Sequence, residues 1–172
     1  MIDWSRIDLY WTASYANAAE RHGREAQESL AHATGNGSMS ANERLEATFR
    51  ATSEASLAAV ALYLGAISAQ RYCSRDDMPA PPLSSEALDR LVAASQHIRD
   101  FVMHWDDKRD DPATRLVVSS ESITLTAPSR RRGKRPLTTW QIPWVAFLDL
   151  ARTLHQWAST LLLSEVEAAA GQ

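Results

Sequence analysis

Hydrophobic residues recur at intervals of three and four over four long stretches of the chain, the spacing that gathers side chains on one face of a helix. The first stretch predicts a helix from about Ser5 to Ala33, ended by turn-forming residues 34–38. The second helix begins at Ser40-Ala41-Asn42-Glu43, which has the spacing of a capping box, and extends to about Tyr72.

A third helix follows a proline-rich loop. Three prolines in residues 78–82 exclude a helix there, so the third helix begins at Ser84 or Ser85 and ends near Asp106. Its predicted buried ridge, about 60° wide, is Leu88, Leu91, Ser95, Ile98, Val102 and Trp105. The acidic run 106–111 closes the helix, because carboxylates oppose the dipole at a helix C-terminus.

Two short β-type runs, 116–118 and 122–126, predict a small hairpin, and Pro143 then marks the first turn of a fourth helix. The fourth helix has a long buried stripe of Trp144, Phe147, Leu148, Ala151, Leu154, Ala158, Leu161 and Leu162. We therefore expect a single all-α domain over residues 1–172, bundle-like with four helices and a small β-hairpin between the third and fourth.

Composition favours one cytoplasmic domain. A chain of 172 residues with 45% hydrophobic residues is long enough to build one core. The single cysteine, Cys73, excludes an intramolecular disulfide and fits a reducing compartment. No basic segment followed by an apolar run opens the chain, and the most apolar stretch, 57–67, is too short to cross a membrane.

The most informative polar residues are Arg99, Asp100 and His104, late in the third helix. Arg99 is predicted roughly 100° to one side of the buried ridge and His104 roughly 120° to the other, so both face water, a ligand or a partner. Asp100 and His104 are four residues apart, so the carboxylate can orient the imidazole and raise its pKa. The guanidinium of Arg99 suits a phosphate group. The same spacing also fits a solvated helix end with an ordinary Asp–His pair.

The motif Arg99-Asp100-x-x-x-His104 resembles the arginine, polar residue, three residues, histidine signature of the HEPN superfamily. The resemblance implies an all-helical domain acting as a metal-independent endoribonuclease of the toxin or defence type. It also implies that Arg99 and His104 meet their symmetry mates across a homodimer interface. The residue after the arginine is often asparagine in that family, and Asp106 stands where AMPylation-silenced toxins carry tyrosine, which argues against that regulation.

A basic loop is the second candidate for contact with RNA. Arg130, Arg131, Arg132, Lys134 and Arg135 carry +5 in a chain whose net charge is −3, so the remainder sums to −8. Such a loop fits salt-dependent contact with a phosphate backbone and equally fits a solvated loop tip. Trp140 and Trp144 flank it and are candidates for base stacking, although Trp144 fits the core better. Six tryptophans and the apolar Met103 beside Arg99 favour a dimer face, although Met103 also fits a single exposed methionine.

No cofactor or metal is expected. The histidines His22, His32, His97 and His155 show no metal-ligand spacing, and the acidic run lacks the glycine and spacing of a calcium loop. The expected partners are RNA, a second copy of the chain and an antitoxin or activator protein, with no membrane. The alternative function is a non-catalytic HEPN-like dimeric scaffold or a nucleotide-binding or ligand-binding sensor.

Overall fold

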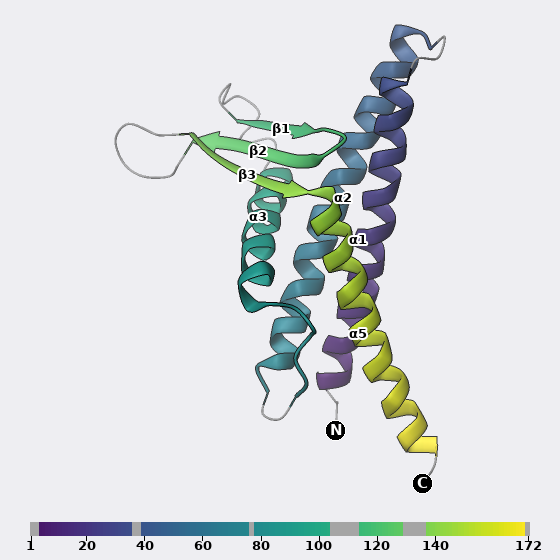
Figure 1. The fold of residues 1–172 in the computed structure, drawn as a ribbon, viewed down its shortest axis with the longest axis vertical. Coiled ribbons are helices and arrows are strands. Elements are labelled where there is room, and N and C mark those ends of the chain that lie inside the picture. Colours follow the sequence, from purple (N-terminus) through teal and green to yellow (C-terminus); the bar gives the residue numbers. More distant parts are fainter. Residues whose placement is uncertain (1–3, 36–38, 76–77, 104–113, 129–136, 171–172) are drawn as a thin grey trace.

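The computed structural model describes residues 4–35, 39–75, 78–103, 114–128 and 137–170 (Figure 1). These residues form a mainly helical domain with a small antiparallel sheet, as the hydrophobic pattern predicts. The elements are α1 (Trp4–Thr34), α2 (Ala41–Cys73), α3 (Ser85–Met103), β1 (Arg115–Val118), β2 (Ser122–Pro128), β3 (Leu137–Pro143) and α5 (Trp144–Ala170).

The two long helices α1 and α2 pack side by side as an antiparallel pair (Figure 1). Their contact faces are rich in alanine, and Ala16, Ala19, Ala55 and Ala58 are completely buried. Small side chains let the two backbones approach closely. A Cβ atom added at Gly65 would lie 3.3 Å from the backbone nitrogen of Ala16. The alanine seam therefore fixes how polar residues on the two helices face one another.

The predicted capping box at the start of α2 is confirmed. The Ser40 hydroxyl accepts from the Glu43 backbone N–H at 3.3 Å, and the Ser40 N–H donates to the Glu43 carboxylate at 2.7 Å. These bonds satisfy backbone donors that a helix N-terminus otherwise leaves unpaired. By length and composition α2 is apolar enough to cross a membrane, but 50% of its most apolar window is buried inside the protein, which is typical of a core helix.

The sheet has three strands in the order β1-β2-β3. The predicted hairpin is present as β1 and β2, and the prediction lacked the third strand. Residues 137–143 form β3, and Pro143 is the last residue of this strand rather than part of a helix. A third strand is physically reasonable because two strands alone are marginally stable. Ile123 of β2 pairs with Ile142 of β3, and both side chains are completely buried.

Trp144 joins the sheet to α5. Its indole Nε1–H donates to the Ser119 carbonyl at 2.8 Å, and its backbone N–H donates to the Glu121 carbonyl at 2.9 Å. The predicted stripe on α5 is largely confirmed: Trp144, Phe147, Ala151, Leu154 and Ala158 are buried, and Leu148, Leu161 and Leu162 are half-buried. This helix packs mainly against α1.

The helix α3 buries a wider face than the sequence predicts. Ser95 and Ile98 of the predicted ridge are completely buried. Three residues outside the predicted ridge, Val92, Ala94 and Phe101, are also buried. On an ideal helix these residues span roughly 180° rather than the predicted 60°. The physical reason is that α3 is covered on two sides, by α2 and by β3.

Candidate functional site

Arg99 lies at the edge of the buried face of α3, where its side chain is partly covered by α2. Its guanidinium carbon sits 4.5 Å from the centre of the Tyr63 ring on α2, a cation–π contact. The side chain is only 31% exposed. The prediction that Arg99 points away from the covered face is therefore wrong, because α2 covers the flank of α3 on which Arg99 stands.

Asp100 holds the same guanidinium. The Arg99 Nε–H donates to the Asp100 Oδ1 at 3.0 Å, and the Nη2 group donates to the same oxygen. The hydrogen bond to Asp100 raises the pKa of Arg99 above its ordinary value, so Arg99 remains a cation at every working pH. Part of its charge is offset by the carboxylate. His104 lies outside the described residues, so the predicted Asp100–His104 pair does as well.

On the opposite flank of α3, His97 stacks on Trp140 of β3. The two ring centroids are 4.0 Å apart and the ring planes are inclined by 29°. The sequence alone did not decide whether Trp140 is a core residue or a base-stacking residue. Within the described residues the half-buried indole covers a histidine and ties the sheet to α3.

The basic residues Arg130, Arg131, Arg132, Lys134 and Arg135 also lie outside the described residues. The strands on either side of them are described. Pro128 at the end of β2 and Leu137 at the start of β3 are direct partners in the sheet register. The two strand ends that flank residues 129–136 therefore lie side by side.

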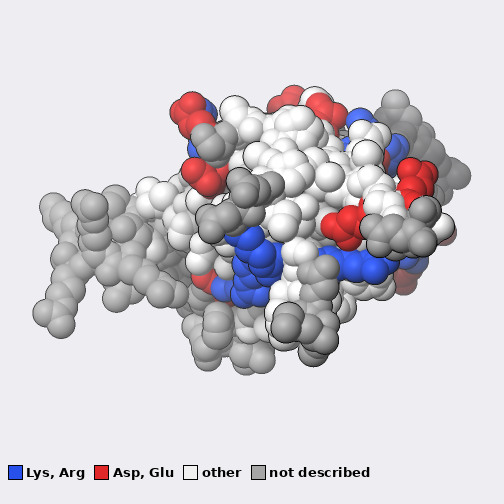
Figure 2. Space-filling view, turned by 90° about the horizontal axis from the view of Figure 1, so that it is seen from below, with Lys and Arg blue, Asp and Glu red and all other residues white. Residues whose placement is uncertain are grey.

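Two of the tryptophans considered for a dimer face are exposed on the first turns of α1. Trp4 is 62% exposed and Trp11 is 44% exposed, whereas Trp144 is in the core. Trp11 also borders a groove of about 610 Å³ between α1 and α5, lined by Arg6, Ile7, Tyr10, Trp11, Leu162 and Val166. In the view from below, charged side chains lie around a broad uncharged area (Figure 2). On α3 itself, Met103 is 69% exposed.

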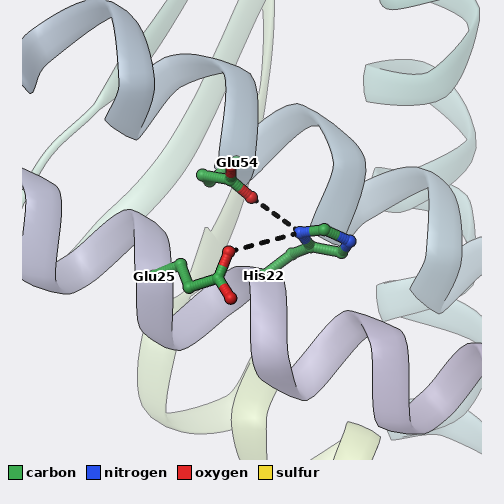
Figure 3. Close-up of side chains that lie close together, drawn as sticks. All are labelled: His22, Glu25 and Glu54. Carbon is green, nitrogen blue, oxygen red and sulfur yellow. Dashed lines mark hydrogen bonds and ion pairs between the residues drawn. The ribbon is translucent and has the colours of Figure 1, made fainter.

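A cluster that the sequence analysis missed lies between α1 and α2 (Figure 3). His22 Nδ1 is 2.6 Å from a carboxylate oxygen of Glu54 and 3.8 Å from one of Glu25. His22 and Glu25 are three residues apart on one helix, which is a recognisable spacing for neighbours on a helix face. Glu54 comes from the facing helix, 32 residues away, so no local pattern indicates it.

Comparison with family models, curated proteins and solved structures finds no match to this chain. The resemblance to the HEPN superfamily therefore remains a hypothesis based on the motif that begins at Arg99 and ends at His104.

Proposed function

We propose that this chain is a metal-independent endoribonuclease of the HEPN toxin or defence type, acting in the cytoplasm. The observation that carries the proposal is the placement of Arg99. Its guanidinium is half-buried and held from two sides, by the Tyr63 ring and by Asp100. A cation fixed in this way does not have to be ordered when a phosphate binds, and such preorganisation is a major source of transition-state stabilisation.

The proposed reaction is an intramolecular transfer at one phosphodiester. His104 removes the proton from an RNA 2′-hydroxyl, and the 2′-oxygen attacks the adjacent phosphorus. The bond from phosphorus to the 5′-oxygen breaks, and the His104 of a second copy supplies a proton to that oxygen. The products are a 2′,3′-cyclic phosphate and a 5′-hydroxyl, and no metal takes part.

Arg99 would stabilise the negative charge of the phosphorane. A guanidinium carries five N–H donors, and Asp100 engages only the Nε and Nη2 groups. Donors therefore remain for a phosphate oxygen while Asp100 keeps the side chain in place. We assign Asp100 this positioning role, in addition to any contact with His104. The basic segment 130–135 would bind the flanking RNA backbone.

The alternative is a non-catalytic HEPN-like dimeric scaffold or nucleotide sensor. The contacts of Arg99 also favour this reading, because an arginine paired with Asp100 and stacked on Tyr63 links α3 to α2 without any substrate. In both readings the chain acts as a homodimer, for which sedimentation should give the mass of two copies at micromolar concentration.

The test is an RNA cleavage assay in EDTA with analysis of the product ends. The parent chain should yield 2′,3′-cyclic phosphates, and His104→Ala should lower the rate at least about 100-fold. Arg99→Lys keeps the charge but loses the planar fork, so it should also be slow. The matched control is Arg90→Ala, since Arg90 stands on the same helix with its side chain 73% exposed.

Three outcomes separate the readings. Loss of activity in His104→Ala and Arg99→Lys with activity retained in Arg90→Ala supports the endoribonuclease. Equal activity in all variants overturns the assignment of the site. An inactive parent that is dimeric and binds nucleotide or RNA supports the scaffold or sensor.

A further inference from the structure

We infer that His22, Glu25 and Glu54 form a binding site for one divalent transition-metal cation between α1 and α2. The three side chains converge from two helices, with His22 and Glu25 on α1 and Glu54 on α2 (Figure 3). Each offers one ligand atom, and these atoms all lie within 4.8 Å of one another. Imidazole nitrogen together with carboxylate oxygen is a donor set suited to Zn²⁺ and its neighbours in the first transition row.

The two distances from His22 Nδ1 lie on either side of the separation that a tetrahedral ion requires. Zinc–ligand bonds of about 2.0–2.2 Å place neighbouring ligand atoms about 3.4 Å apart. The distance from His22 Nδ1 to Glu54 is 2.6 Å and that to Glu25 is 3.8 Å, so the two values bracket the required separation. Side-chain movements alone would complete the arrangement, because the three ligand atoms already lie within 4.8 Å of one another.

The backbone holds these side chains in place. The alanine seam packs α1 closely against α2, and Ala26, Ala51 and Ala55 beside the cluster are completely buried. The side chains of His22 and Glu54 are each only 21% exposed. Partial burial weakens competition from water and leaves the side chains of His22 and Glu54 little freedom to lose on binding.

A polar cavity of about 310 Å³ adjoins the cluster and gives room for water ligands. It is lined by Glu25, Glu28, Ser29, Arg50 and Glu54. Three carboxylates face one guanidinium, so the cavity favours a cation despite Arg50. This negative balance is the second feature, besides ligand geometry, that a divalent ion requires.

Metal binding would have to replace the hydrogen bonds that the His22 ring makes in this structure. One tautomer, with a proton on Nδ1, satisfies both ring nitrogens: Nδ1–H donates to Glu54, and Nε2 accepts from Arg21 at 3.3 Å. A bound metal takes the Nδ1 lone pair, so the ring proton moves to Nε2 and Arg21 turns away. Arg21 is exposed, which allows this movement.

The metal site is separate from the proposed ribonuclease site. Glu54 and Tyr63 are nine residues apart on α2, which is about 180° around the helix and about 13 Å along its axis. Metal binding therefore joins α1 to α2 on one face, and Arg99 contacts the other. Cleavage of RNA in EDTA and binding of metal can succeed or fail independently.

The experiment is isothermal titration of the metal-stripped full chain with Zn²⁺. The parent should bind one ion per chain and gain thermal stability, because the ion binds the folded state. His22→Ala and Glu25→Gln should each weaken binding at least about tenfold. His32→Ala is the matched control, since His32 is an exposed histidine on the same helix that borders a different cavity. Circular dichroism checks that each variant keeps its helical content.

Glu25→Gln decides the case if His22→Ala does not fold, because the Glu25 side chain is 46% exposed and its replacement leaves the helix pair intact. Absence of Zn²⁺ binding by the parent overturns the inference. Unchanged binding in Glu25→Gln overturns it as well, and so does loss of binding in His32→Ala alone, which would place the ion in the neighbouring cavity.

Discussion

The guanidinium of Arg99 lies 4.5 Å from the centre of the Tyr63 ring, so a residue of the candidate active site is also part of the contact between α3 and α2. Its replacement therefore changes both chemistry and stability. For this reason the assay of function needs Arg99→Lys rather than Arg99→Ala alone.

Removing the ring should weaken the fold. We expect Tyr63→Leu to lower the free energy of unfolding by about 1–2 kcal/mol, because the cation–π contact is partly shielded from water. Tyr63→Phe keeps the ring and should change stability much less. A double-mutant cycle with Arg99→Gln, measured by urea unfolding, should give a coupling of about 0.5–2 kcal/mol. Additive effects would contradict this relationship.

Trp144→Phe should destabilise the protein by about 1–3 kcal/mol. The substitution removes the indole donor to the Ser119 carbonyl and leaves space in a site where Trp144 is only 1% exposed. Trp4→Phe is the matched control, because Trp4 is 62% exposed. Thermal unfolding of the two variants measures the difference, and equal melting temperatures would count against the link between the sheet and α5.

Gly65→Leu should separate α1 from α2 and cost about 1–3 kcal/mol or more. A Cβ atom added there would lie 3.3 Å from the Ala16 nitrogen and 3.4 Å from the Tyr15 Cβ, and both belong to the facing helix. Ala31→Leu introduces a leucine at an exposed position of α1 and should have little effect. Urea midpoints that fall equally for both variants would disprove close approach at Gly65.

Acid should remove the contribution of Glu20 to stability. The hydrogen bond from Arg24, at 2.7 Å, is the main cause that lowers the pKa of Glu20 below its ordinary value of 4.5, and Arg152 of α5 adds to it. Because the folded-state pKa is the lower one, the stabilisation is complete above about pH 4.5 and disappears as the pH falls through the folded value. The stability difference between the parent and Glu20→Gln should therefore shrink from pH 7 to pH 3. A constant difference would contradict the ion pair.

Neutralising the basic segment should reduce the salt dependence of RNA binding. Replacing Arg130, Arg131, Arg132, Lys134 and Arg135 by glutamine removes five charges. If all five contact phosphates, the slope of log affinity against log salt should fall by roughly 3.5 for single-stranded RNA. Filter binding at several salt concentrations measures the slope, and an unchanged slope would show that the segment does not contact the backbone.

Local sequence signals predicted the helices well because each signal acts within a few residues. Ser40 and Glu43 mark the start of α2, and the apolar stripe from Trp144 to Ala158 marks α5. The strand β3 was missed because Pro143 also fits the first turn of a helix, and only pairing with β2 reveals the strand.

The candidate sites depend on contacts between elements, which periodicity does not encode. The direction of Arg99 follows from the position of Tyr63 on another helix, and Glu54 meets His22 only because α1 and α2 pack in one register. Only the permanent charge and planar donor group of Arg99 were predictable from its residue type alone.

No residue separates β3 from α5, so a tilt of the sheet would also tilt the C-terminal helix. The strand ends at Pro143 and the helix begins at Trp144, whose two hydrogen bonds clamp this junction to the turn between β1 and β2. The helix has 27 residues and is therefore about 40 Å long. A tilt of about 5° imposed on the sheet would displace the far end of α5 by about 3.5 Å. A movement of the sheet would thus act mechanically on the groove beside Trp11, which Leu162 and Val166 of α5 also line.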